Sequence, residues 1–248
     1  MTTKSCFVAL ALITCAAGAW AQTTLTVSQT DNIMIPDNDL SGVAETITLG
    51  SSIQSITGVQ LTLDVGGTAN YQPFDGDYYA YLIHGSSQAV LLNRVGVTAI
   101  NPFGYADTGF DVTFSGGGSD IHNYQNGSYT LNGSGQLTGT WAPDGRTASP
   151  LTVLNTSPRT ALLSSFNGGN AGGDWTLFIA DTSPGAIGDL EGWTLQVTGN
   201  SGTNNPVPDG GNTLGLLALA FGLMVLTSSN TFKRMPQPCA SGPQLPVK

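Results

Sequence analysis

Aspartate is the residue type whose number and placement could do chemistry in this chain of 248 residues. Fourteen of the 16 acidic residues are Asp, and most of them stand in segments rich in Gly, Ser and Asn. A hard cation such as calcium takes roughly six to eight oxygen ligands, and turns of this composition offer both carboxylates and carbonyl groups. Some of these aspartates are therefore candidate ligands of a structural calcium ion. For each of them, a role as turn former or as solubilising residue at a strand edge stays open.

Candidates for enzymatic catalysis are few. His84 precedes a turn and His122 lies among polar loop residues, so the ordinary interpretation of each is an exposed or hydrogen-bonded side chain rather than a catalytic base. The sequence has no Gly-x-Ser-x-Gly nucleophile turn, and Cys6, Cys15 and Cys239 all stand near the ends. We therefore predict no catalytic residues and no thiol chemistry. A Ser, His and Asp set assembled across the fold is the alternative.

The charge balance excludes one class of partner. The chain has 7 basic and 16 acidic residues, a net charge of −9, and its only basic residues between 22 and 206 are Arg94, Arg146 and Arg159. Such a surface cannot neutralise nucleic-acid phosphates, so we predict no nucleic-acid partner. The 40% content of hydrophobic residues is enough to bury a core, which excludes a disordered chain.

The N-terminal segment has the layout of a secretory signal peptide. Lys4 precedes an apolar run, and Ala19-Trp20-Ala21 provides the small residues of a cleavage site. We predict that residues 1–21 are removed on export. A buried N-terminal helix, or lipidation at Cys15, is the alternative.

The C-terminal segment has the three parts of a receptor-read sorting tail. After a predicted linker over 200–206, a short motif is followed by an apolar run over 214–226 and by the basic pair Lys233-Arg234. The motif residues are Val207, Pro208, Asp209, Gly210 and Gly211. The segment resembles the VPDSG subtype of bacterial C-terminal sorting signals, which are related to the PEP-type tails that exosortases process.

This resemblance implies a bacterial exported protein with an exosortase-type enzyme as its processing partner. Segment 207–234, with a transmembrane helix and a basic stop, would hold the chain transiently in the inner membrane before cleavage near Asp209, and residues 235–248 form a tail. We predict delivery to the cell envelope or the extracellular surface. A plain C-terminal anchor is the alternative. The apolar run of 214–226 gives roughly 20 Å of helix, against a hydrocarbon core of roughly 30 Å.

A period of two dominates the body of the chain. Apolar residues alternate with polar ones over 59–65, 110–114, 175–179 and 193–197. The segments 78–83 and 89–92 are apolar on both faces, which predicts central strands joined by a tight turn. We therefore predict that residues 22–199 form one all-β domain, a jelly-roll-like β-sandwich. At strand periodicity, Trp175 and Trp193 are predicted to be core residues.

An ordered set of motifs carries a second resemblance. The set comprises Ile35-Pro36-Asp37-Asn38, 55–64, 76–84, 90–94, Phe166-Asn167-Gly168, Gly173-Asp174-Trp175-Thr176-Leu177, Ala180-Asp181 and 188–195. It resembles the P domain of proprotein convertases, the β-sandwich that follows the subtilisin-like catalytic domain of kexin- and furin-type proteases. The family's protease segments are absent here, and 123–137 has the character of an inserted hairpin loop. The resemblance also implies structural calcium held by loop carboxylates, and the candidate ligands at comparable places are Asp75, Asp77, Asp107, Asp111 and Asp120.

Three functions remain open from the sequence. The first is an exported, non-catalytic sandwich with a binding or structural role at the cell surface or in extracellular matrix. The second is an accessory that docks on a separately encoded subtilisin-like protease. The third is a hydrolase of unknown type.

Overall fold

Alternating residues form the inner and outer faces of long strands. The computed structural model describes residues 22–67 and 71–201. In β3 (Ile53–Gly66), Val59, Leu61 and Leu63 are buried, while the residues between them are exposed or half-buried. Burial of the apolar face of such a strand stabilises the fold by roughly 25 cal/mol per Å² of apolar area removed from water. The alternation in the sequence therefore identifies the faces of these strands correctly.

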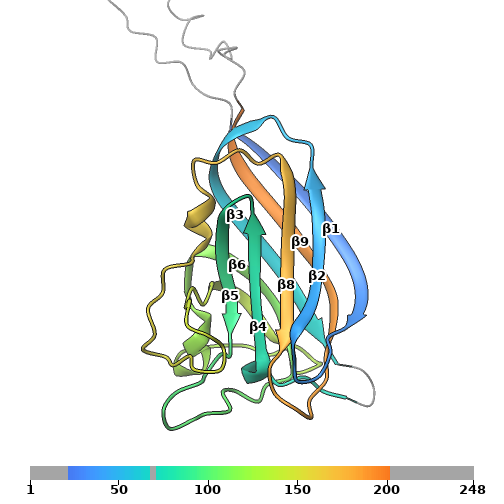
Figure 1. Ribbon diagram of the computed structural model, residues 1–248, viewed down its shortest axis with the longest axis vertical. Helices are drawn as coiled ribbons and strands as arrows, with labels where there is room; N and C mark the ends of the chain where they lie inside the picture. The colour runs from blue at the N-terminus through green and yellow to red at the C-terminus, as the bar shows by residue number, and fades with distance from the viewer. Residues whose placement is uncertain (1–21, 68–70, 202–248) are drawn as a thin grey trace, which may run out of the picture. The chain divides into compact units, whose positions relative to one another are not determined.

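Two antiparallel-rich sheets pack face to face in Figure 1. The first has the order β1 (Gln22–Met34), β9 (Asp189–Ser201), β3, β6 (Phe110–Asp120) and β7 (Leu137–Ala142). The second has the order β2 (Asp39–Leu49), β8 (Gly173–Asp181), β4 (Tyr78–His84) and β5 (Ser87–Asn93). The predicted all-β sandwich is confirmed. Trp175 and Trp193 are buried between the sheets, as predicted.

The prediction of central strands is right for β4 and wrong for β5. Strand β4 lies between β8 and β5, whereas β5 is the last strand of its sheet. Its residues Ala89–Asn93 are nevertheless buried, because the segment after β7 covers this edge. The amide groups of Asp144 and Gly145 donate to the carbonyls of Leu91 and Val90. An edge strand covered by a loop therefore has the composition of a central one.

Three short 3-10 helices complete the described structure: η1 (Asp75–Asp77), η2 (Ile121–Asn126) and η3 (Leu163–Phe166). The predicted hairpin is right for the second half of 123–137: the segment begins in η2, and its later part folds back through hydrogen bonds from Asn132 to Gln136 and from Thr138 to Thr130. Only one antiparallel bridge, between Leu131 and Leu137, is formed within it. Strand β7, which pairs parallel to β6, has no counterpart in the sequence-based prediction.

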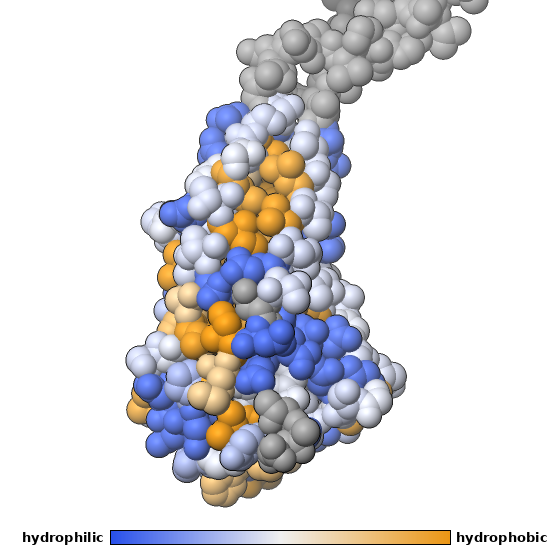
Figure 2. All heavy atoms as spheres, turned by 90° about the vertical axis from the view of Figure 1, so that its right-hand side faces the viewer, coloured by the Kyte–Doolittle hydropathy of each residue, from blue (hydrophilic) through white to orange (hydrophobic). Residues whose placement is uncertain are grey.

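The open side of the sandwich lies along the edge strands β1 and β2. Strand β1 pairs only with β9, and β2 pairs only with β8. Figure 2 shows an apolar strip on this side of the molecule. Leu25 and Val27 of β1 and Val43 of β2 are partly buried and pack against the core. We interpret the strip as the margin of the core.

The sandwich has two unlike ends. Gln22 of β1 pairs with Asn200 of β9, so both ends of the described body lie at one end, which we call proximal. The opposite, distal end carries the connections 34–39, 93–110 and 181–189 and the segment 71–78, at the bottom of Figure 1. Long connections at one end can build a site on a rigid scaffold.

Several sequence-based predictions fall outside the described residues. These are the signal peptide 1–21, the sorting motif Val207 to Gly211 and the rest of 207–248. Of the predicted linker 200–206, Asn200 and Ser201 belong to β9. Within 22–67 and 71–201, no helix is long and apolar enough to cross a membrane.

Candidate functional site

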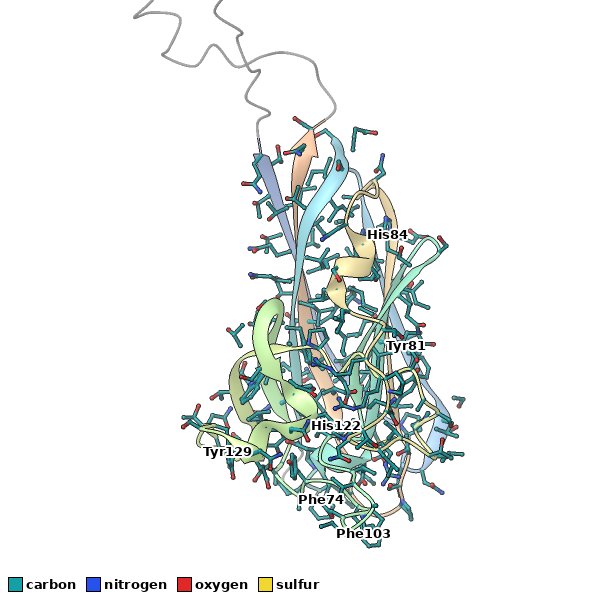
Figure 3. All side chains as sticks on the ribbon, turned by 90° about the vertical axis from the view of Figure 1, so that its left-hand side faces the viewer. Phe74, Tyr81, His84, Phe103, His122 and Tyr129 are labelled. Carbon is teal, nitrogen blue, oxygen red and sulfur yellow. The ribbon has the colours of Figure 1, made fainter. Side chains whose placement is uncertain are left out.

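A hollow of about 470 Å³ opens at the distal end. We call it the distal hollow. It lies where η1, the connection 93–110 and the connection 181–189 meet. Its aromatic lining residues are Phe74, Phe103 and Tyr105, and its polar ones are Asp77, Arg94 and Ser183. Figure 3 shows Phe74 and Phe103 together at this end, far from His84.

Arg94 ties the three walls of the distal hollow together. Its Nε donates to the carbonyl of Gly76 at 3.0 Å, and its Nη2 donates to the carbonyl of Pro102 and to Oγ of Ser183, both at 3.3 Å. Its backbone has a φ of +52°, a conformation that is uncommon for a residue with a side chain. The surrounding structure must hold a residue in such a conformation. Where the residue lies at a cleft, this suggests a functional role for it.

The connection after Arg94 is an ordered loop. The side-chain amide of Asn101 donates to the carbonyls of Gly96 and Gly104, and its backbone exchanges hydrogen bonds with Thr98. The loop also packs without clearance on η1, because a Cβ added to Gly76 would lie 2.2 Å from the carbonyl oxygen of Phe103. The loop is therefore pre-organised by its own hydrogen bonds and by close backbone contact.

This ordered loop holds large apolar side chains in solvent. Ile100 is 95% exposed and Phe103 is 78% exposed. Phe74 and Leu151 are also exposed, and Leu151 lines a second hollow of about 360 Å³ that shares Arg94 and Pro102 with the first. We call Phe74, Ile100, Phe103 and Leu151 the distal apolar surface. Exposed apolar groups gathered on ordered loops are typical of an interaction site.

The carboxyl groups beside the distal hollow are poorly compensated. Burial raises the pKa of Asp77, and the Ser183 hydroxyl and Arg94 only partly offset this. Burial also raises the pKa of Asp181 to about 7, helped by the nearby charges of Asp77 and Asp37. Oδ1 of Asp181 accepts from the Ser183 amide, but its buried Oδ2 has no hydrogen-bond partner. Two incompletely compensated carboxyl groups therefore lie close to the hollow.

Asp75 and Asp107, two of the predicted calcium ligands, meet at one tyrosine. The Tyr124 hydroxyl lies 2.8 Å from Oδ2 of Asp75 and 2.8 Å from Oδ2 of Asp107. The Gly109 amide donates to Oδ1 of Asp75, whose pKa burial raises well above its usual value. One phenolic proton cannot serve two carboxylates. Both contacts of the Tyr124 hydroxyl can be hydrogen bonds at the same time when the buried carboxyl of Asp75 is protonated and donates to the hydroxyl oxygen.

The other three predicted ligands lie apart from this pair. Asp77 lines the distal hollow, and Asp111 is exposed on β6 opposite Asp64 of β3. Asp120 accepts from Arg146 at 2.9 Å, which with other donors holds its pKa below the usual value despite burial. Among residues 22–67 and 71–201, no group of three His, Cys, Asp or Glu side chains is placed to hold a metal ion. The five candidates do not converge on one ion, and calcium binding stays a prediction.

Neither histidine has a free ring nitrogen. His122 is buried, with Nδ1 2.7 Å from Oδ2 of Asp144 and Nε2 3.0 Å from the carbonyl of Val97. His84 stacks on Trp175, and its two ring nitrogens lie 2.8 and 2.7 Å from the carbonyls of Asp174 and Asn170. These contacts agree with the predicted role of hydrogen-bonded polar side chains.

Sequence reasoning missed the residues that build the distal hollow. The turn signal Asn101-Pro102-Phe103-Gly104 was available, because Asn-Pro and Phe-Gly steps favour a turn over a strand. The role of Arg94 had no such signal, since its three acceptors come from separate segments.

Comparisons with known proteins do not identify a family for this chain. No family model matches the sequence, and no curated protein matches it. Similar solved structures include the serine protease of Aeromonas sobria, at 16% identity and a TM-score of 0.40, and its complex with the chaperone ORF2, at 17% and 0.39. Each match covers 73% of this chain and 27% of the solved chain. The chain thus spans about a quarter of these structures, and at these TM-scores the likeness defines neither a family nor an activity for it.

Proposed function

We infer that the chain is a non-catalytic binding domain of an exported protein, and that its distal apolar surface docks on another protein. The observation that carries this inference is the ordered loop that holds Ile100 and Phe103 almost fully in solvent. Exposing two large apolar side chains has a cost in water, and an ordered loop that maintains this exposure favours a docking role.

The state of the histidines supports a role without catalysis. A general base needs a ring nitrogen that can reach a substrate proton. All four ring nitrogens of His84 and His122 already lie within hydrogen-bond distance of protein oxygens. The polar groups of the distal hollow, which are Asp77, Arg94 and Ser183, include neither histidine.

The predicted signals at the two ends support a location outside the cytoplasm. A signal peptide over 1–21 and an exosortase-type tail over 207–234 would deliver the domain to the cell envelope or the extracellular surface. Both ends of the described body lie at the proximal end, so the distal loops point away from either connection. A binding role at the cell surface or in extracellular matrix fits this polarity.

Docking on a separately encoded subtilisin-like protease is a more specific version of this function. It is favoured by the P-domain resemblance, whose motifs Gly173-Asp174-Trp175-Thr176-Leu177 and Gly192-Trp193-Thr194-Leu195 lie in β8 and β9. Co-purification with such a protease from the source cells would separate this version from binding to a matrix component.

Photo-crosslinking in the source cells tests the docking surface. A photoreactive phenylalanine analogue replaces Phe103 in the full-length protein, and the matched control carries it at Tyr129, which is exposed on another loop in Figure 3. We expect crosslinks to one discrete protein from position 103 and none from position 129. Equal crosslinking from both positions, or none from either, would contradict the proposal.

A further inference from the structure

The chemistry of the distal end also indicates what kind of partner it takes. Resting on the docking function inferred above, we propose that the distal hollow receives a Lys or Arg side chain from a basic, apolar segment of the partner protein. Three features of the described residues carry this proposal: the charge of the distal loops, the lining of the hollow, and the state of Arg94.

The distal loops are almost free of positive charge. In the described parts of 34–39, 66–78, 93–110 and 181–189, the only basic residue is Arg94. The acidic residues of these loops are Asp37, Asp39, Asp75, Asp77, Asp107, Asp181 and Asp189. The remaining described arginines, Arg146 and Arg159, are already paired with Asp120. Complementary charge steers association, so this end favours a cationic partner.

The lining of the hollow matches a long cationic side chain. Lys and Arg have an apolar stem and a charged head, and they gain from apolar walls together with a nearby carboxylate or an aromatic face. The aromatic rings of Phe74, Phe103 and Tyr105 provide the walls, and Asp77 provides a carboxyl group at the hollow. Arg94 and the Ser183 hydroxyl compensate this carboxyl group only in part, so a basic side chain would add to its compensation and an acidic one would oppose it.

Arg94 does not oppose such a ligand. Its Nε and Nη2 are committed to Gly76, Pro102 and Ser183, and its charge is offset by Asp77. Asp37 is exposed and lies near enough to Asp77 and Asp181 to raise the pKa of both. Asp39 is exposed, and hydrogen bonds from Ser41 lower its pKa, which keeps it charged. The distal loops around the hollow therefore have more acidic than basic residues.

A lipid surface fits these observations less well. Ile100 and Phe103 could enter an apolar phase, but the acidic rim would be repelled by anionic lipid, and burying charged carboxyl groups in a membrane is costly. A membrane is therefore an outcome that the experiment must separate from a protein partner.

Three labelled synthetic peptides test the class of ligand on the full-length protein. One alternates Leu and Arg, one alternates Leu and Glu, and one alternates Ser and Arg. We expect fluorescence anisotropy to show the Leu and Arg peptide binding at least about tenfold more tightly than either of the others. We also expect raising NaCl from about 0.05 to 0.5 M to weaken this binding about tenfold, because exposed charges are screened.

Matched variants place the binding at the hollow. Phe103→Ser should weaken the Leu and Arg peptide about tenfold, and the double change Asp37→Asn with Asp39→Asn should weaken it about threefold. The control Asp174→Asn, at an exposed acidic residue near the proximal end of β8, should bind as the wild type does. Circular dichroism confirms that each variant is folded.

The outcomes distinguish this proposal from the docking function. Equal affinity for the Arg and Glu peptides, or binding that Phe103→Ser leaves unchanged, would overturn the proposal. So would sedimentation with phosphatidylcholine or phosphatidylglycerol vesicles that depends on Phe103. If crosslinks from position 103 persist in such a case, the docking function stands and only the basic ligand class is lost.

Discussion

The molecule contains two groups of buried charged residues that differ in how their charges are paired. On the flank of the sandwich, Asp144 accepts from His122 and Arg146, and Asp120 accepts from Arg146. At the distal end, Oδ2 of Asp181 has no hydrogen-bond partner, and Arg94 donates to two carbonyl groups and one hydroxyl group. The two carboxylates of the flank cluster are each paired with Arg146, although Nε of this arginine has no hydrogen-bond partner. Asp181 of the distal group has no such ion pair within the described residues, which is the state expected at a site that binds a partner.

The largest effect is expected from breaking the flank cluster. Arg146→Met would leave Asp144 and part of Asp120 without their cation in a buried setting, at a cost of about 3–5 kcal/mol in the free energy of unfolding. Urea unfolding of the full-length protein measures this. Arg159→Met is the comparison, since this side chain is partly exposed, lies 3.6 Å from Asp120 and donates to the carbonyls of Asp144 and Pro143; its loss should cost about 1–2 kcal/mol. Similar losses for both variants would remove the contrast between the two groups.

A smaller effect is expected at the tyrosine that joins Asp75 and Asp107. Tyr124→Phe removes the hydroxyl and leaves Oδ2 of Asp75 buried without a partner, which should cost about 1–3 kcal/mol. The control Tyr129→Phe, at a partly exposed ring, should stay within about 0.5 kcal/mol of the wild type. An unchanged stability of Tyr124→Phe in urea unfolding would show that the network does not hold these loops.

The distal group should also make stability fall with rising pH. Burial raises the pKa of Asp181 from its ordinary value of 3.8 to about 7, so the folded state binds this proton more tightly than the unfolded chain does. The resulting stabilisation is complete below the unfolded pKa and is lost as the pH rises through about 7. We expect a loss of about 1–2 kcal/mol between pH 5 and pH 8.5, measured by urea unfolding.

Asp181→Asn should flatten this pH dependence, because an amide does not titrate. Asp39→Asn is the matched control, since its carboxyl has a lowered pKa and is ionised throughout that range. A slope that survives in Asp181→Asn would assign the pH dependence to another group.

The smallest effect is expected from calcium. The carboxyl groups of Asp75, Asp107 and Asp120 already have hydrogen-bond partners within the protein, so added calcium should raise the melting midpoint of the full-length protein by less than about 2 °C. Magnesium is the control. A larger rise that is specific for calcium and is abolished by Asp77→Asn would reinstate a metal site at the distal end.

The sandwich was predictable because its signal is local. Alternation around Trp175 and Trp193 places each of these residues on the inner face of its strand, and the structure buries both. The edge position of β5 was not predictable, because its cover comes from residues near Asp144, far along the chain.

The distal site was predictable only in part. Asp77 was singled out as a candidate, but the 3-10 turn of η1 sends Asp75 to Tyr124 and Asp77 to the hollow, although only one residue separates them. Phe is a residue type that is usually buried in the core. The exposure of Phe103 depends on the close backbone contact between its loop and Gly76. Such contacts between distant segments leave no pattern in the local sequence.

The position of β9 between β1 and β3 has a mechanical consequence. Strand β9 has 13 residues, which at about 3.3 Å each give a length of about 43 Å from the distal loops to the proximal end. Tension between a partner held at the distal loops and the proximal end of β9 would run along this strand. Two rows of hydrogen bonds would then be loaded in shear, so that many bonds share the force at once instead of opening one after another.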